Sequence, residues 1–278
     1  MSVSKPAFVF VHGYWHNSRT WARVVPDLKA KGYTTCTLDL PGAGRNAKLP
    51  SSYLARDAAA FATEPSPNAS VTQEERTRAV VDVVKAAGKP VVLVGHSMGG
   101  ATISDVAEII PGSVVALVYL TAMLLPPGVP PVHVAQHETM AAALVPSLLR
   151  ADPEVVGALR LDPRSEDADY RANFKATFYG DVDDAELTDF LLALHCDEPL
   201  STFVRPSAVT AERFGAIPRH YIRCTGDRAI TIEGQDYMIA SMDAALGTTT
   251  IKHTMAASHS PFLSQSAALA NLLADIAG

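Results

Sequence analysis

The chain has 278 residues, of which 48% are hydrophobic and 19% are charged. This composition supplies enough apolar side chains for a sizeable core and argues against a disordered chain. The net charge of −6 leaves no basic surface for nucleic acid or anionic lipid, so we expect neither as a partner. No apolar run reaches the roughly 18 residues needed to cross a bilayer, so we also expect no membrane partner.

The cysteines and the N-terminus bear on the cellular compartment. Cys36, Cys196 and Cys224 are far apart and odd in number, which favours free thiols in a reducing compartment. The segment Met1–Pro6 lacks the basic-then-apolar pattern of a signal peptide. We therefore expect a cytoplasmic protein, and the sequence carries no signal for its oligomeric state.

Short apolar runs rich in β-branched residues predict strands along both terminal thirds of the chain. They are Ala7–Val11, Thr34–Leu38, Val91–Val94, Ser113–Thr121, Pro218–Cys224 and Thr248–His253. Helical spacing and capping signals predict helices between them. These are Thr20–Lys31, a helix from the capping box at Thr72–Glu75 to about Gly88, Ala101–Ile110, Gly234–Ala245, and a last helix that starts at Pro261 with Ser260 as its cap.

The alternation of strands and helices predicts a mostly parallel sheet with helices on both faces. The rhythm breaks at Pro126, and from about Val132 to Gly215 we see helical patches and no strand. The patches are Thr139–Leu149 and Ala185–Leu194, and the acidic run 181–186 fits a first helical turn better than a calcium loop. We expect a core of residues 1–125 and 216–278 and a helical lid of residues 126–215.

The stretch Gly95-His96-Ser97-Met98-Gly99 follows a predicted strand and reads Gly-x-Ser-x-Gly. Small residues two places either side of a serine allow a sharp strand-to-helix turn, which lifts the hydroxyl toward a substrate. Serine is a weak nucleophile at neutral pH, so the motif also requires a base and an orienting acid. Ser97 is the predicted nucleophile.

His259 is the best candidate for the base, because it lies between the last predicted strand and the helix that begins at Pro261. Asp227 follows the preceding strand, so it should lie at the same edge of the sheet. Other aspartates fit less well: Asp39 precedes the nucleophile, while Asp105 and Asp243 lie inside predicted helices. The order Ser97, Asp227, His259 is the nucleophile, acid and base order of the Gly-x-Ser-x-Gly hydrolases.

An acyl-transfer site also needs two N–H donors for an oxyanion. The N–H of Met98 follows the nucleophile at the start of a helix, and the N–H of Tyr14 follows the turn at His12-Gly13. We interpret His12 as a residue that fixes this loop by hydrogen bonds. His96 is also interpreted as structural, since its side chain should point away from that of Ser97.

The candidate pocket residues are Gly13, Trp15, Met123 and Leu124, and the last three would fit the core equally well. The apolar lid favours a hydrophobic ester over a sugar or a peptide. Two histidine pairs, His12/His16 and His133/His137, have the spacing of metal ligands but no carboxylate that completes a zinc set. We expect no metal and no cofactor.

These residues together resemble the α/β-hydrolase superfamily over nearly the whole chain. The matching landmarks are Val11-His12-Gly13, Gly95–Gly100, Thr225-Gly226-Asp227 and Ser258–Phe262. Details are similar to the branch that holds plant methyl esterases, hydroxynitrile lyases and pyrethroid-hydrolysing carboxylesterases. They are a Trp after His12-Gly13, the segment Leu38–Gly42 with Gly44, and Ala257–Pro261. The resemblance implies an α/β-hydrolase fold, with the lid inserted after the strand that follows the nucleophile.

Departures from that branch separate its activities. The resemblance implies that lyases carry a threonine and a lysine where this chain has Gly13 and Ser260, which favours hydrolysis. Some relatives place the acid after the strand that follows the nucleophile, but Tyr119–Met123 contains no carboxylate. Ser97 also argues against the aspartate nucleophile of dehalogenases and epoxide hydrolases.

The sequence therefore predicts a serine carboxylesterase that forms an acyl-enzyme with a small-molecule ester. Two alternatives stay open at this point. The same fold and triad occur in small-molecule receptors that turn over slowly, and the same scaffold supports hydroxynitrile lyase activity.

Overall fold

The computed structural model describes residues 5–278, apart from the side chains of residues 188 and 189. Its strands are β1 (Ala7–Val11), β2 (Thr34–Thr37), β3 (Val91–Ser97), β4 (Val114–Ala122), β5 (Ala158–Arg160), β6 (Asp197–Pro199), β7 (Arg219–Cys224) and β8 (Ile251–Met255). Its α-helices are α1 (Val24–Ala30), α2 (Ser51–Ala55), α3 (Ala58–Phe61), α4 (Gln73–Ala86), α5 (Gly99–Ile109), α6 (Pro131–Ala135), α7 (Val145–Leu148), α8 (Pro153–Val156), α9 (Ala168–Phe178), α10 (Asp184–Leu191), α11 (Leu200–Val204), α12 (Ile232–Leu246), α13 (Pro261–Ser264) and α14 (Ser266–Ala277).

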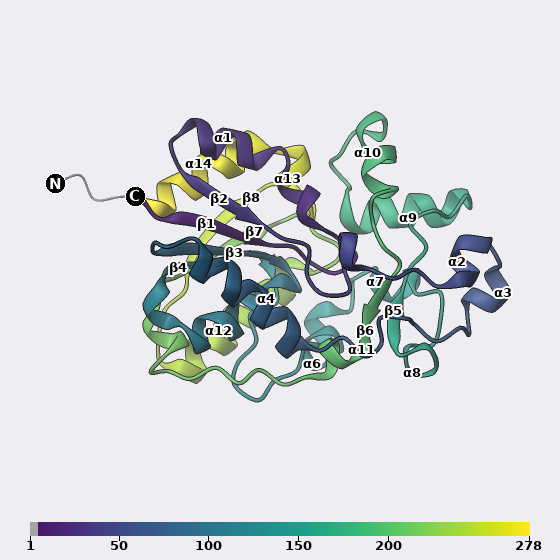
Figure 1. Cartoon of the computed structure of the whole chain (residues 1–278), viewed down its shortest axis with the longest axis horizontal. Helices are drawn as coiled ribbons and strands as arrows, with labels where there is room; N and C mark the ends of the chain where they lie inside the picture. Colours follow the sequence, from purple (N-terminus) through teal and green to yellow (C-terminus); the bar gives the residue numbers. More distant parts are fainter. Residues whose placement is uncertain (1–4) are drawn as a thin grey trace.

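A six-stranded parallel sheet in the order β2-β1-β3-β4-β7-β8 forms the centre of the molecule. Helices α1 and α14 cover one face, and α4, α5 and α12 cover the other (Figure 1). The central strands β1, β3 and β4 are buried almost throughout, because both of their faces meet helices. The chain therefore has the α/β-hydrolase fold that its sequence predicts.

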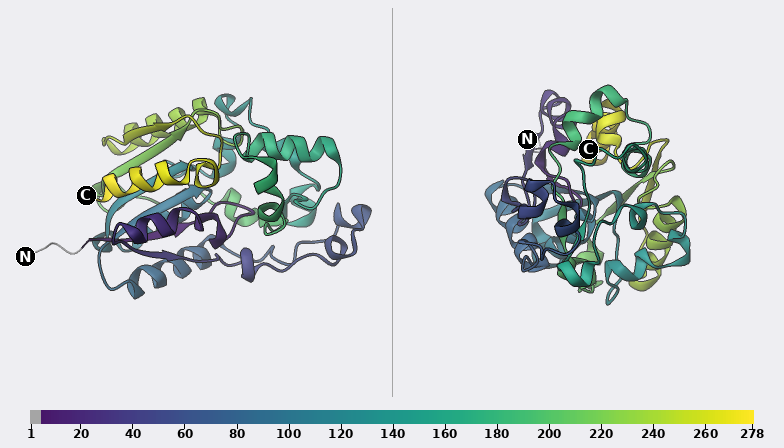
Figure 2. Two further views of the ribbon diagram at one scale, coloured as in Figure 1. Left: turned by 90° about the horizontal axis from the view of Figure 1, so that it is seen from above. Right: turned by 90° about the vertical axis from the view of Figure 1, so that its right-hand side faces the viewer.

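The register of the sheet brings the predicted site residues to one edge. Val11 pairs with Gly95, and Cys224 pairs with Met255. The loops that follow β1, β7 and β8 carry Tyr14, Asp227 and His259, and all begin at the carboxyl ends of parallel strands of the same sheet. The lid covers this edge, and the C-terminal helix α14 extends toward the opposite end (Figure 2).

The lid differs from its prediction in one respect. Instead of having no strand, it contains β5 and β6, which pair antiparallel. Each is only three residues long, too short to show alternation, and the Asp-Glu-Pro sequence of β6 is a poor strand former. Buried charge pairs hold it: Arg160 of β5 contacts Asp197 of β6 at 2.7 Å.

The lid also receives a contribution from the segment between β2 and β3. Helices α2 and α3 lie beside β5 and α8 in Figure 1. The buried guanidinium of Arg160 donates to the backbone oxygens of Phe61 and Glu64 at 2.5 and 2.7 Å. Tyr53 and Phe61 pack with Cys196 in a small cluster of their own.

Prolines explain where helix boundaries depart from prediction. The expected helix Thr20–Lys31 is a 3₁₀ turn at Ser18–Trp21 followed by α1, and Pro26 is tolerated because it lies in the first turn of α1. The patch Thr139–Leu149 is reduced to α7 after a 3₁₀ turn at Glu138–Met140. By contrast, the capping box at Thr72 is confirmed, with both of its hydrogen bonds present.

The two remaining predictions of helix starts, at the acidic run and at Pro261, have different outcomes. The acidic run is confirmed as a first helical turn at Asp184 and Glu186 of α10, whereas Asp181 accepts hydrogen bonds from the hydroxyls of Ser258 and Ser264. The helix at Pro261 exists, but Ser260 does not cap it: its buried hydroxyl has no partner within the described residues.

Candidate active site

Ser97 lies at a strained turn between β3 and α5. Its φ is +52°, in the left-handed region that residues with a Cβ rarely adopt. Met98 then takes the right-handed conformation as the residue before α5. The carbonyl of Ser97 accepts the N–H of Met123 at 2.9 Å. This hydrogen bond ties the turn to the end of β4.

The glycines around Ser97 are required by close backbone contacts. A Cβ on Gly95 would lie 2.8 Å from the carbonyl oxygen of Gly99, and one on Gly99 would lie 2.6 Å from that of Val11. Real Cβ atoms do not approach oxygen so closely. The Gly-x-Ser-x-Gly spacing is therefore a packing requirement of the turn.

His259 and Asp227 form a buried pair next to this turn. His259 Nδ1 lies 2.6 Å from Asp227 Oδ2, and both side chains are about fully buried. A carboxylate accepts, so Nδ1 carries the proton and Nε2 is left as the basic nitrogen. Within the described residues no hydrogen bond joins Ser97 to His259, a contact that often tightens only when substrate binds.

Asp227 is itself held by four donors. Its Oδ1 accepts the N–H groups of Ala229 and Ile230 at 2.7 and 2.9 Å. Its Oδ2 accepts the hydroxyl of Thr121 in addition to His259. Thr121 is the residue before the last one of β4 and has φ of +36°, so a strained residue on the neighbouring strand fixes the carboxylate. From the sequence we infer only that this strand end contains no carboxylate, and no sequence pattern indicates the role of Thr121.

His96 ties the strand of the serine to the loop of the histidine. Its Nε2 donates to the carbonyl of His259 at 2.9 Å, and the two rings lie 4.5 Å apart between centroids. Burial holds the pKa of His96 well below its usual value. The ring is therefore neutral, which agrees with the structural role predicted for it.

The loop after β1 presents Tyr14 beside the serine. His12 is buried, and burial lowers its pKa to about 4. Its Nε2 accepts the N–H of Leu40 at 3.1 Å, so Nδ1 must donate to the carbonyl of Gly13 at 2.8 Å. Because the carbonyl of Gly13 is held in this way, the N–H of the same peptide, on Tyr14, points to the opposite side.

Within the described residues, neither of the two predicted oxyanion donors has a hydrogen-bond acceptor. Among residues 5–278, no group accepts the N–H of Tyr14 or that of Met98. A Cβ built on Gly13 would lie 2.6 Å from the Cβ of Ser97. The loop and the serine are therefore in direct contact, and glycine is required where they meet.

The remaining candidate pocket residues, Trp15, Met123 and Leu124, are all buried. Trp15 is 5% exposed and lies 5.9 Å from Phe178 of α9 between ring centroids. The Phe178 ring also lies 5.7 Å from that of His259, so it extends from the lid over the histidine. Met123 and Leu124 are similarly buried, at 6% and 0% exposed, and belong to the same core cluster as Trp15.

Three of the four histidines with metal-like spacing, namely His12, His16 and His137, make other hydrogen bonds. His16 Nδ1 donates to the carbonyl of Tyr14 at 2.6 Å, and Nε2 accepts the hydroxyl of Tyr179 at 2.8 Å. His12 likewise uses both nitrogens, and His137 contacts Thr139. In the described part of the chain no group of three or more His, Cys, Asp or Glu is placed to hold a metal ion.

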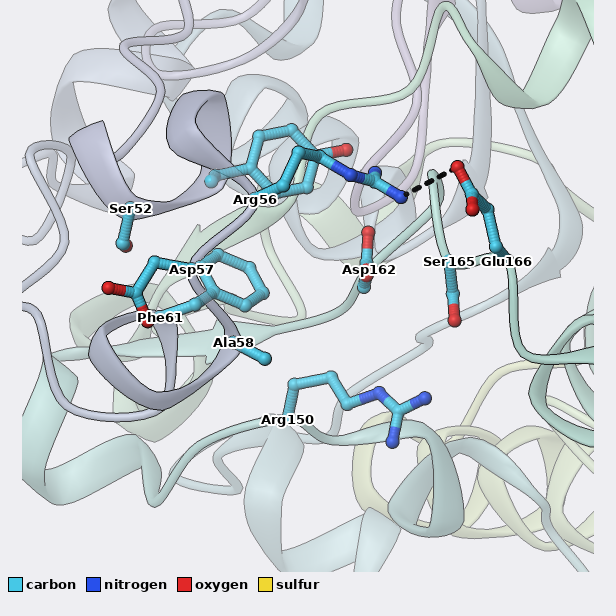
Figure 3. A pocket seen from close by; sticks show the side chains of 10 residues that line it. Ser52, Arg56, Asp57, Ala58, Phe61, Arg150, Asp162, Ser165 and Glu166 are labelled. Atoms are coloured by element: carbon cyan, nitrogen blue, oxygen red, sulfur yellow. Dashed lines mark hydrogen bonds and ion pairs between the residues drawn. The ribbon is translucent and has the colours of Figure 1, made fainter.

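A hollow of about 420 Å³ lies elsewhere, between α2–α3 and the lid (Figure 3). Arg56 spans one side of it by an ion pair with Glu166 at 3.3 Å, and Arg150 lies at the other side. Its lining contains none of the predicted site residues.

None of the helices described is both long and apolar enough to pass through a bilayer.

Comparisons with known proteins bear on this geometry. A sequence profile described as the alpha/beta hydrolase family matches residues 8–272. The pyrethroid hydrolase of Sphingobium wenxiniae is 27% identical to this chain over 97% of the chain and 86% of that enzyme. Esterase PIR7B of Oryza sativa subsp. japonica is 28% identical over 99% of this chain and 97% of the esterase.

Solved structures give the same result at the level of the fold. The crystal structure of a pyrethroid hydrolase from Sphingobium faniae matches with a TM-score of 0.78 and 25% identity, over 99% of this chain and 98% of that one. The crystal structure of polyneuridine aldehyde esterase matches with a TM-score of 0.72 at 21% identity, over 99% of this chain and 100% of the esterase. The likeness thus includes the lid as well as the sheet.

Proposed function

This chain belongs to the alpha/beta hydrolase family, and on that premise we propose that it hydrolyses carboxylic esters with Ser97 as nucleophile, through an acyl-enzyme. Relatives named as methylesterase, pyrethroid hydrolase and esterase support ester hydrolysis. The observation that carries the proposal is the buried pair of His259 and Asp227, 2.6 Å apart, beside a serine in a left-handed turn.

In the proposed reaction, Nε2 of His259 takes the proton of Ser97 as the serine oxygen attacks the ester carbonyl carbon. The carbonyl oxygen becomes an oxyanion, which accepts the N–H groups of Tyr14 and Met98. The imidazolium then protonates the leaving alcohol as the ester C–O bond breaks. A water molecule attacks the acyl-enzyme in the same way, and Ser97 recovers its proton.

We further propose a hydrophobic small-molecule ester as the substrate. Phe178 and Trp15 lie next to the histidine and the donor loop, and Phe174 packs on Phe178 with ring centroids 5.1 Å apart. These aromatic rings offer apolar contact and few polar partners, which suits an apolar acyl or alcohol group better than a sugar.

The direct test replaces Ser97 by alanine. We expect Ser97→Ala to lose on the order of 10⁴-fold or more in kcat with a short-chain 4-nitrophenyl ester. It should also lose labelling by a fluorophosphonate, which attaches to the nucleophilic serine of the wild type. Ser104→Ala is the matched control, because Ser104 is a buried serine of α5 that bonds to Gly100 and Tyr119. A Ser97→Ala variant that keeps most of the wild-type activity would refute the proposal.

The same assays decide between this function and its two alternatives. Repeated turnover of the ester supports an enzyme, whereas one slow acylation without turnover supports a receptor. Release of cyanide from mandelonitrile would support a lyase. We do not expect it, because Ser260, where the lyases carry a lysine, is fully buried and offers no charge to the leaving group.

A further inference from the structure

A buried glutamate of the lid contacts the loop that carries Tyr14. Glu198 lies in β6 and is 0% exposed. Its Oε1 accepts the backbone N–H of Trp15 at 2.6 Å and Nε2 of His195 at 2.8 Å. Its Oε2 accepts the guanidinium of Arg76, from core helix α4, at 2.7 Å. One carboxylate thus joins the lid, the core and the loop after β1.

Glu198 contacts the loop at a residue with a strained backbone, Trp15. Trp15 has φ of +59°, a left-handed conformation that is unfavourable for a residue with a Cβ and persists only where its surroundings impose it. Its N–H lies one peptide after the N–H of Tyr14, the proposed oxyanion donor. Tyr14 is thus held from two sides: His12 fixes the preceding peptide, which carries the Tyr14 N–H, through the Gly13 carbonyl, and Glu198 fixes the following peptide through the Trp15 N–H.

The lid makes further contacts to the same loop. The Trp15 indole N–H donates to the carbonyl of Leu159 at 3.2 Å, and the Trp15 carbonyl accepts the N–H of His195 at 3.2 Å. The Tyr14 hydroxyl lies 2.5 Å from that of Thr202. Among these contacts only Glu198 brings a charge to a backbone N–H.

The charge state of Glu198 suits this role. Burial alone would raise its pKa, but Arg76 and His195 lower the pKa to about 2. The carboxylate is therefore ionised throughout the neutral range. A hydrogen bond from an N–H to an ionised acceptor is roughly twice as strong as one to a neutral acceptor.

We propose that Glu198 is a positioning residue of the active site, which holds the loop of Tyr14 and Trp15 in the conformation that presents the oxyanion donor. The inference rests on the proposed function, because it assumes that the Tyr14 N–H meets an oxyanion. It gives Glu198 of the lid a part in positioning the oxyanion donor, although Glu198 touches no reacting atom.

The test is Glu198→Gln, read out by kcat and by the affinity for a transition-state analogue, and the second readout does not depend on the fraction of enzyme that is folded. We expect kcat for a 4-nitrophenyl ester to fall by about 10- to 100-fold while KM stays within about twofold, because a misdirected donor acts on the transition state. We also expect weaker inhibition by an alkyl trifluoromethyl ketone, by about the same factor. The Ser97 oxygen adds to that ketone, and the resulting oxyanion needs the donor.

Asp197→Asn is the matched control. Asp197 is the neighbouring buried carboxylate of β6, but it pairs with Arg160 inside the lid and does not contact the loop. We expect this variant to lower the melting temperature and leave kcat and the ketone affinity within about twofold of the wild type. If Glu198→Gln does not fold, Glu198→Asp retains the charge beside Arg76 while withdrawing the oxygen from Trp15, and the same losses are expected.

The outcomes separate the inference from the proposed function. A folded Glu198 variant with wild-type kcat and ketone affinity would overturn the inference. So would equal losses of kcat in the Glu198 and Asp197 variants, since these would indicate a general effect of a damaged lid. If instead the wild type neither hydrolyses esters nor reacts with fluorophosphonate, the proposed function fails, and the inference fails with it.

Discussion

Replacing Asp227 by asparagine tests how the carboxylate fixes the proton on His259. At Oδ1 the side chain accepts two N–H groups, from Ala229 and Ile230. The asparagine oxygen must take this place, because an amide NH₂ there would face two donors. The NH₂ group is then directed at His259 Nδ1, which can only accept it by giving up its proton. The proton moves to Nε2, and the imidazole can no longer accept the proton of Ser97.

The structure sets the size of this effect. The opposite amide orientation, which would preserve the correct tautomer, leaves two buried N–H groups without acceptors at a cost of about 1–3 kcal/mol each. The productive orientation is therefore disfavoured by about 2–6 kcal/mol, which corresponds to a loss of about 30- to 10⁴-fold in kcat. Since a wrong histidine tautomer costs about 10⁴-fold in serine proteases, we expect the upper end.

The assay is kcat/KM for a 4-nitrophenyl ester, with ¹⁵N chemical shifts of labelled His259 to report which nitrogen is protonated. Asp236→Asn is the control, because Asp236 pairs with Arg223 at 3.2 Å near the surface, and the variant should stay within about twofold of the wild type. The reasoning is refuted if a folded Asp227→Asn variant keeps more than about one tenth of the activity, or if its His259 still carries the proton on Nδ1.

Two further predictions concern acid stability and the glycine beside the nucleophile. Burial lowers the pKa of His12 to about 4 and that of His16 to about 3. Below pH 6.5 these two histidines therefore bind protons in the unfolded chain but stay neutral in the folded chain. The free energy of unfolding in urea should then fall by about 2 kcal/mol per histidine between pH 7 and pH 5, and equal values at both pH would contradict this. Gly13→Ala should lower kcat/KM by about 10-fold or more, because its Cβ would displace Ser97. Gly112→Ala, with nothing within 4 Å of the added Cβ, should not, and equal activities would refute the argument.

Most of the sheet was predictable because parallel strands are buried on both faces. Such strands appear in the sequence as continuous apolar runs, and β1 has the bounds predicted for it, Ala7–Val11. The positions of Ser97, Asp227 and His259 at one edge follow from the same pattern, since each comes after a strand and parallel strands end together. No tertiary contact had to be known for that step.

The contacts that support the site were not predictable in this way. Thr121 and Glu198 lie far from Asp227 and Trp15 in the sequence, and each acts through one hydrogen bond that only the folded chain creates. Glu198 stands in a polar stretch that ends in proline, which favours a loop, yet it forms a strand because its charge is compensated by Arg76. Local sequence patterns carry no signal for such compensation across the fold.

The attachment of the lid limits how a substrate can reach Ser97. Moving β6 away from the core would separate Glu198 from Trp15 and Arg76 together. A second tie lies on the other side of the site, where Asp181 accepts the hydroxyl of Ser258, the residue before His259. A rigid opening of the lid would therefore dismantle both the donor loop and the histidine loop. A substrate that is to meet an intact donor loop and an intact histidine loop must therefore reach Ser97 while both ties remain in place.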